Sequence, residues 1–312
     1  MKKEYPEVEY LSDFFISDIT KVIKDNVTIA QHKELVVNDA CFEAKGWYIL
    51  DIASRGDGNI VTTRNASKLS SHITVSNRKS EIQRQDQMNI HVNKPVRGLL
   101  SESKAVTWDG CYEIGIYDVR DGAYSKKNVR NGITSWPSDQ CVSCVTTDPV
   151  KNHIIVGTNR RHVYVFTVQL NYSHMLTLRD VIHGALDITV QRGNLLVCCN
   201  RSDKACAVTV EESQSMLMYE FTKPDFFGWD WRPTSVCTDT NEFIYMLWNA
   251  AMSCHRGCIL VQYSQDGRQL LTTRRVEGNF YRLSTFAENG TEKLLISNMI
   301  WGELYTYDLL VT

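Results

Sequence analysis

One unit of sequence recurs along this chain of 312 residues, and it constrains the fold more than any other feature. Each copy contains a short strand, a turn with Asp, Gly or Asn, and a second apolar strand, as in 142–149 followed by 154–156. The second strands begin at residues 60, 105, 154, 195, 244 and 294. Their average spacing of about 47 residues is the length of a four-stranded propeller blade.

Two further strands are expected in each copy. Alternating apolar and polar residues predict a third strand, as in 162–166 and 259–263. Asp-Gly pairs at 121–122 and 266–267 then suit tight hairpins, because glycine accepts a positive φ. The sequence therefore predicts an all-β six-bladed β-propeller of four-stranded antiparallel blades. A seven-bladed ring is the alternative, and it needs a further blade within residues 1–45.

The sixth copy lacks a fourth strand after residues 304–307. An open edge there leaves backbone groups unpaired, and a segment within 26–40 has the apolar character to cover it. The sequence thus predicts a propeller over 26–312, closed by an N-terminal strand. Residues 1–25, whose apolar positions fall near helical spacing, are expected to form an N-terminal arm or a short helix packed on the ring.

A family resemblance rests on two features of these copies. An apolar residue, two further residues and Asp precede the second strand at 145–148 and 236–239, and Asp-Gly hairpins follow later. Over about residues 46–312 the pattern resembles the NHL-type repeat of six-bladed propellers, as in the C-terminal domains of TRIM-NHL proteins. Gln191 and Arg55 stand where that pattern has Asp. The resemblance implies a propeller that binds protein or RNA.

Charge and processing signals exclude several classes of protein. With 34 basic and 36 acidic residues the net charge is −2, so bulk charge does not drive polyanion binding, and DNA is not an expected partner. No apolar run has the length of a signal peptide or a membrane span, so a soluble cytoplasmic protein without a membrane partner is expected. A chain of this size has no need of disulfides, and its 10 cysteines are predicted to be free thiols.

The residues that line the centre of such a ring do not suggest catalysis. Asp51 and Asp187 are expected near the centre, but the equivalent positions in other copies are Ser, Cys or apolar residues. Calcium takes 6–8 oxygen ligands, and no such set can be assembled here. Cys141 and Cys144 fall on opposite faces of a predicted strand, and Cys254 and Cys258 have no matching pair, which disfavours zinc. No catalytic residue, metal or other cofactor is predicted.

The loops between second and third strands are expected to gather on one face of the ring. They contain Arg and Trp, the residue types enriched at interaction hot spots, although each Trp could instead pack between blades and each Arg could be solvated. The predicted partner-binding residues are Arg64, Trp108, Arg160, Arg161, Arg201, Trp248, Arg256 and Trp301. The sequence therefore predicts a non-enzymatic recognition or scaffold module that binds a protein or peptide. An RNA-binding NHL-like propeller is the alternative, and a channel-based metal-dependent hydrolase ranks last.

Overall fold

A computed structural model describes most of the chain in detail, and its side chains are described only within residues 103–309. The segments whose backbone is described are 33–43, 48–54, 60–67, 70–76, 82–88, 96–101, 103–108, 112–118, 120–133, 136–178, 184–199, 203–211, 214–225, 230–250, 257–276, 280–288, 291–298 and 303–311. The arm or helix predicted for residues 1–25 lies outside these segments. No helix in the described part is long and apolar enough to cross a membrane.

The described segments contain 24 strands. The first half of the chain forms β1 (Lys33–Glu43), β2 (Tyr48–Ser54), β3 (Ile60–Ser67), β4 (Ser70–Ser76), β5 (Ile82–Met88), β6 (Val96–Ser101), β7 (Lys104–Trp108), β8 (Glu113–Asp118), β9 (Tyr124–Asn128), β10 (Val142–Asp148), β11 (His153–Thr158) and β12 (His162–Thr167). The second half forms β13 (Tyr172–Thr177), β14 (Ala185–Gln191), β15 (Asn194–Cys199), β16 (Ala205–Glu211), β17 (Gln214–Glu220), β18 (Trp231–Thr238), β19 (Ile244–Ala250), β20 (Cys258–Tyr263), β21 (Leu270–Val276), β22 (Phe280–Glu288), β23 (Thr291–Asn298) and β24 (Glu303–Val311).

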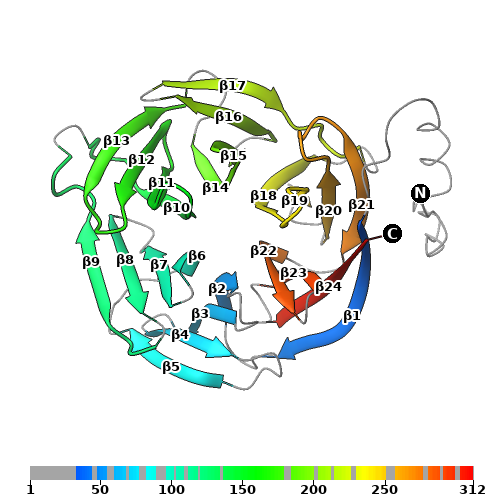
Figure 1. Cartoon of the computed structure of the whole chain (residues 1–312), viewed down its shortest axis with the longest axis horizontal. Helices are drawn as coiled ribbons and strands as arrows, with labels where there is room; N and C mark the ends of the chain where they lie inside the picture. Colours follow the sequence, from blue (N-terminus) through cyan, green and yellow to red (C-terminus); the bar gives the residue numbers. More distant parts are fainter. Residues whose placement is uncertain are drawn as a thin grey trace, which may run out of the picture.

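The strands form a β-propeller built from four-stranded antiparallel units (Figure 1). From β2 to β21, four consecutive strands make each unit, and the last unit combines β22, β23 and β24 with β1; the units follow one another around a ring. The first strand of each unit lies nearest the centre, and the fourth lies on the outer circumference. We call β2, β6, β10, β14, β18 and β22 the inner strands, and β5, β9, β13, β17 and β21 the outer strands. The all-β propeller predicted from the repeat is therefore the observed fold.

The number of separate sheets differs from the six that the sequence predicted. Hydrogen bonding groups the strands into five sheets, because one sheet has eight strands in the order β10-β11-β12-β13-β17-β16-β15-β14. Two four-stranded units merge there through one parallel bridge, between Thr177 of β13 and Gln214 of β17. The sequence missed this merger because one bridge between polar residues leaves no hydrophobic pattern.

Strand β1 joins a sheet formed otherwise by the last three strands of the chain. Its sheet has the order β1-β24-β23-β22, and β1 runs antiparallel to β24. The register places Leu35 opposite Leu309 and Val37 opposite Tyr307, with a shift between Asn38 and Cys41. The segment predicted to pair here, within residues 26–40, thus overlaps the paired strand.

A repeated irregularity shows that the units are structurally equivalent. Pairing between the first two strands shifts by one residue at the same point of five units, between the residues flanking Leu50, Ser143, Leu186, Thr234 and Tyr281. A bulge of this kind bends the strand and re-aims the side chains beside it. Side chains next to the bulge are therefore expected to point toward the neighbouring unit in the same way in each of these five units.

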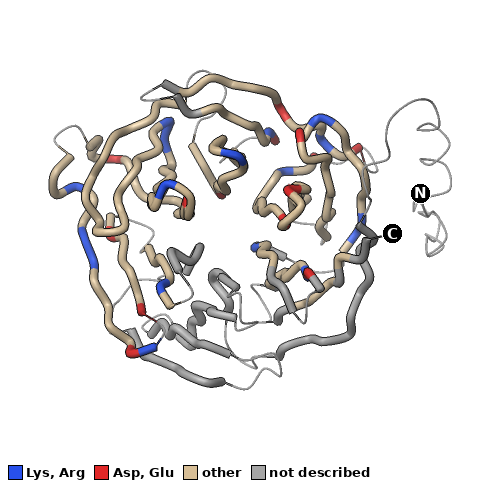
Figure 2. Tube along the Cα trace, viewed as in Figure 1, with Lys and Arg blue, Asp and Glu red and all other residues tan. Residues whose placement is uncertain are grey.

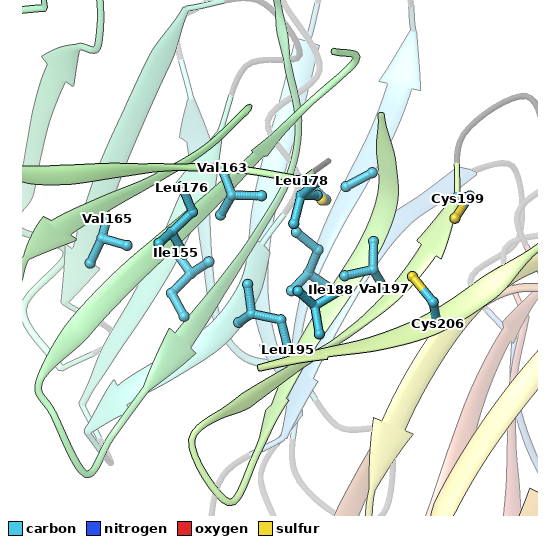
Figure 3. Packing of buried hydrophobic residues seen from close by; sticks show 13 residues of the cluster. Ile155, Val163, Val165, Leu176, Leu178, Ile188, Leu195, Val197, Cys199 and Cys206 are labelled. Carbon is cyan, nitrogen blue, oxygen red and sulfur yellow. The ribbon is translucent and has the colours of Figure 1, made fainter. Parts of the chain in front are cut away.

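The hydrophobic cores lie between consecutive units. One cluster combines Ile155, Val163 and Leu176 of the β10–β13 unit with Ile188 and Val197 of the next unit (Figure 3). Three similar clusters occupy other seams of the described part of the ring. Burial of apolar area at about 25 cal/mol per Å² stabilises the ring chiefly at these seams.

The Asp residues that suggested an NHL-type repeat stabilise the turn after the inner strand. The Asp148 carboxylate accepts hydrogen bonds from the backbone N–H groups of Val150 and Lys151. Asp239 accepts one from the N–H of Phe243. Gln191, which replaces Asp in its unit, instead donates across the seam to the Glu242 and Gln265 carbonyls. The recurring Asp is thus explained by its hydrogen bonds, which stabilise the turn after the inner strand, and no ligand is needed to account for it.

Candidate binding face

The connection 129–141 and the loop 158–162 lie together at the edge of the ring where β11 ends and β12 begins. The Asn159 N–H donates to the Cys141 carbonyl at 3.0 Å, and the Cys141 N–H donates to Asn159 Oδ1 at 2.8 Å. The Asn159 amide also donates to the Asp139 carbonyl at 3.3 Å. These bonds fix the 158–162 loop to the preceding connection.

Three other contacts hold the same loop: one within it, one from the next unit and one from the end of β13. The Thr158 hydroxyl donates to the His162 carbonyl at 2.7 Å, which closes the turn. Gly184, at φ 139°, lies so close to the Asn159 backbone that a Cβ there would collide with it. The Leu178 N–H donates to the Arg161 carbonyl at 2.7 Å. The loop is therefore preorganised, which reduces the ordering cost of binding.

This loop presents two consecutive guanidinium groups. Both Arg160 and Arg161 are exposed. Arg160 forms an ion pair with Asp139, and both of these side chains are more than half exposed, so the pair contributes little to stability. A carboxylate from a partner could compete with Asp139 for this guanidinium at small cost.

Aromatic side chains lie in and against the 129–141 connection that holds this loop, and the sequence did not predict them. The rings of Trp136 and Tyr164 are stacked with centroids 4.6 Å apart, and Trp136 Nε1 donates to the Gln140 carbonyl at 2.9 Å. The Arg130 guanidinium lies 3.3 Å from the centroid of the Tyr112 ring. Trp136 and Tyr112 are both half-buried. We call Tyr112, Arg130, Trp136, Asp139, Arg160 and Arg161 the Arg160 rim.

A buried amide supports the rim from below. Gln140 is fully buried, donates to the Tyr164 hydroxyl at 2.8 Å, and accepts through Oε1 from His162 Nδ1 at 2.7 Å. Burial lowers the pKa of His162, which favours the neutral imidazole, and burial likewise raises the pKa of Tyr164. All three groups are thus neutral at pH 7, and they serve as a rigid floor rather than as an acid–base set.

Two of the tryptophans predicted to bind a partner are core residues instead. Trp108 ends β7 and is 8% exposed, and Trp248 lies within β19 and is 0% exposed. Both pack into clusters between units. The prediction that they lie on the binding face is wrong, because the second strand continues through each Trp and turns it into a seam.

The arginines of the prediction divide into three groups. Arg160 and Arg161 lie exposed on the same loop. Arg64 lies inside β3, opposite Ile49 of β2 and His72 of β4, so it does not occupy a loop. Arg201, Arg256 and the remaining Trp301 fall outside the described residues, and their part in binding stays a prediction.

Polar residues of the inner strands form buried contacts between units. Asp187 Oδ2 accepts from the Ser235 hydroxyl at 2.6 Å and from the Val236 N–H at 3.0 Å. Ser235 Oγ in turn accepts from the Leu283 N–H at 3.0 Å, which extends the chain of bonds to a third unit. Asp187 and Ser235 are 1% and 0% exposed. This Asp–Ser pair is inaccessible to a substrate, and it joins three inner strands.

Metal-binding chemistry finds no support in the described residues. No group of three His, Cys, Asp or Glu side chains there is arranged to hold an ion. Cys141, Cys144, Cys198, Cys199, Cys206, Cys237 and Cys258 are free thiols. Cys206 illustrates their setting: a hydrogen bond with Cys199, together with burial, raises the pKa of its thiol far above the ordinary value. Such thiols act as small apolar side chains in the seams.

Comparison with known proteins identifies the architecture and no more. No family model matches the chain, and no curated protein matches its sequence. Among solved structures, the chain is similar to the β-propeller domain of Cps50 (Swd1) from Myceliophteria thermophila. The two share 8% identity with a TM-score of 0.60, over 89% of this chain and 99% of that domain. At this identity the likeness supports the propeller fold, while the NHL-type resemblance is not confirmed.

Proposed function

We propose that this chain is a protein-binding propeller of six blades, closed by β1, that holds a partner at the Arg160 rim. Six blades follow if the two units of the eight-stranded sheet are counted separately, since one bridge joins them. The pairing of β1 with β24 supports closure. Propellers commonly serve as protein-interaction scaffolds, which agrees with this reading and with a non-enzymatic role.

The observation that carries the proposal is the preorganised 158–162 loop. It presents two exposed arginines, and its backbone is bonded to the 129–141 connection, in or against which the half-buried Trp136 and Tyr112 lie. Arg and Trp are enriched among residues that dominate binding energy, and rigid placement lowers the entropic cost of using them. An acidic or phosphorylated segment of a protein fits this chemistry, because guanidinium pairs bidentately with carboxylate or phosphate.

The charge distribution favours protein over RNA. Single-stranded nucleic acid requires a positively charged track along its backbone. Several described cations are instead neutralised locally, as in the ion pairs of Arg160 with Asp139, Arg192 with Glu242, and Lys223 with Asp203 and Asp230. The net charge of −2 points the same way.

The test is the double reversal Arg160→Glu/Arg161→Glu, compared with Lys126→Glu/Lys127→Glu on β9. Both variants change the charge equally, but only the first alters the rim. We expect the first to lose at least about tenfold of the protein recovered from lysate, equivalent to roughly 1.4 kcal/mol. The melting temperature should stay within about 2 °C, since exposed loop residues contribute little to stability.

Nuclease treatment and salt distinguish the two partner classes. Recovery that survives nuclease and depends weakly on salt supports a protein partner. Recovery that disappears with nuclease and falls steeply with salt indicates RNA instead. Equal recovery with both double variants contradicts the rim as the binding face.

A further inference from the structure

The outer strand β17 exposes three consecutive apolar side chains. Met216, Leu217 and Met218 are 57%, 44% and 47% exposed, and we call them the β17 patch. Among the side chains that the structure describes, the other exposed large apolar residues are Val150 and Tyr172, which lie apart from each other in sequence. Single exposed apolar residues are ordinary, but a contiguous group marks a contact site.

A bulge makes a further strand an unsuitable cover for the β17 patch. Leu217 lies opposite Val208 of β16 and Tyr219 lies opposite Ala207, so Met218 is the extra residue between them. A bulge twists an edge away from strand addition. The patch is therefore an apolar side-chain surface, and an amphipathic helix can cover such a surface without backbone pairing.

The surface next to the patch leads toward β21 of the following unit. Tyr219 lies so close to Gly267, in the turn before β21, that a Cβ on Gly267 would collide with its ring. Leu270 and Leu271 follow this turn and are half-buried. No charged residue occurs in β17 before Glu220, and Figure 2 shows a tan tube along this part of β17, whereas blue appears toward the end of β21. An apolar helix face thus meets no charge on the patch itself.

The far end of β21 borders the strand that follows the N-terminal segment. Val276, the last residue of β21, packs in one cluster with Leu309, which lies opposite Leu35 of β1. The Arg274 guanidinium lies 5.5 Å from the centroid of the Tyr307 ring on β24. Figure 1 shows the same order around the circumference, from β17 through β21 to β1. The N-terminal segment therefore joins β1 only one outer strand away from the patch.

The sequence of the N-terminal segment has the pattern of an amphipathic helix. Its large apolar residues recur at intervals of three and four, at Val8, Leu11, Phe15, Ile19 and Val22. In a helix these residues share one face, and the opposite face carries Glu9, Asp13, Ser17, Thr20 and Lys24. Pro6 followed by Glu7 suits the first turn of such a helix. The apolar face of a helix like this needs another surface to cover it.

The length of the chain permits the segment to reach the patch. Strand β21 has 7 residues and extends about 23 Å. Residues 23–32 span up to roughly 33 Å when extended, so they can carry a helix over 8–22 past β21 to β17. The tether also gives the segment an effective concentration of about millimolar, which favours it over a partner in solution.

We propose that residues 8–22 form an amphipathic helix that packs its apolar face on the β17 patch of the same chain. The apolar stripe and the patch then cover each other, and the tether selects this segment as the occupant. The helix acts as an intramolecular cap that keeps the patch from binding other chains. This contact lies away from the Arg160 rim and does not depend on it.

Hydrogen exchange of the full chain, followed by mass spectrometry, tests the contact. We expect amides within residues 8–22 to exchange at least about tenfold more slowly in the wild type than in Met218→Asp, because the variant places a charge under the apolar face. Val150→Asp is the matched control, since it alters an exposed apolar side chain elsewhere and should leave this exchange unchanged. Melting curves verify that both variants fold.

Two matched isoleucine variants test which face of the helix is covered. Ile19 belongs to the apolar stripe, whereas Ile16 lies roughly 100° from the middle of that stripe around the helix axis. Ile19→Asp should abolish the slow exchange, and Ile16→Asp should retain most of it. Equal loss in both variants contradicts a helix that packs through this stripe.

Photo-crosslinking identifies the occupant of the patch. Benzoylphenylalanine in place of Met218 should crosslink to residues 8–22 within one chain, independently of protein concentration. Exchange in the wild type as fast as in Met218→Asp overturns the proposal, and so do crosslinks that join two chains, which would assign the patch to a second copy. Arg160→Glu/Arg161→Glu should keep the slow exchange, so failure of the rim and failure of this cap are separate outcomes.

Discussion

The inner strands and the outer strands of the ring use polar groups in opposite ways. On the inner strands, Asp187 and Ser235 are buried, and each accepts or donates hydrogen bonds across a seam. On the outer strands, charged groups such as Lys126 are half exposed and paired at the surface. Buried polar side chains of the inner strands therefore join neighbouring units by hydrogen bonds. Exposed charged side chains of the outer strands instead determine which partners can bind at the surface.

This difference explains why Asp187, a buried carboxylate of an inner strand, is a poor candidate for a catalytic residue. Its carboxylate accepts hydrogen bonds from a hydroxyl and two backbone N–H groups, and removing such a partner costs more than the bond contributes. The rim and β17 are different, because their guanidinium groups and apolar side chains face solvent without a comparable set of buried partners.

The largest expected effect comes from the outermost strand of the β22–β24 sheet. Deleting residues 1–43 removes β1 and exposes the edge of β24, while deleting residues 1–32 leaves β1 intact. We expect the longer deletion to lower the melting temperature by at least about 10 °C and the shorter one by much less. Thermal unfolding followed by circular dichroism measures both. Equal melting temperatures would mean that β1 contributes nothing to closure.

The next effect tests the inner strands directly. Asp187→Ala leaves the Ser235 hydroxyl and the Val236 N–H without their acceptor, and it should lower the free energy of unfolding by about 3 kcal/mol. Asp121→Ala is the matched control, because the Asp121 carboxylate accepts from the Ala123 N–H in an exposed turn. Asp121→Ala should lower the free energy of unfolding by about 1 kcal/mol or less. Urea unfolding curves give both values, and similar costs would refute the contrast between centre and circumference.

The smallest expected effect is a pH dependence of the free energy of unfolding. It is caused by His162 of β12, a strand that lies between the inner strand and the outer strand of its unit. Burial lowers the pKa of His162, so the unfolded chain binds its proton more readily than the folded protein does. Stability is therefore complete above the unfolded pKa near 6.5 and declines as the pH falls through it toward the lower folded value. His162→Asn keeps a donor for Gln140 and should flatten this part of the profile. Identical slopes for both proteins between pH 7 and 5 would exclude His162 as the cause.

Hydrophobic periodicity allowed the strands to be predicted closely. The second strands expected at residues 154, 195 and 244 begin at 153, 194 and 244. Periodicity did not reveal where a strand ends: Trp248 was placed in a loop, yet β19 continues to Ala250 and buries it. Because Trp suits both a core and an exposed contact surface, its residue type could not decide between them.

The candidate site was only partly predictable. Arg160 and Arg161 follow a strand in the repeat, so their loop could be located from spacing. Trp136 lies in a connection between units that the repeat does not include, and its stacking on Tyr164 depends on the fold.

Pairing of β1 with β24 also has a consequence for the order of folding. Leu35 meets Leu309, so the contact joins parts of the chain nearly its whole length apart. During synthesis β1 leaves the ribosome long before its partner, and its edge stays uncovered while the intervening units form from local hairpins. Completion of this last sheet is therefore expected to be the slow step, and a chaperone that shields β1 would act in that interval.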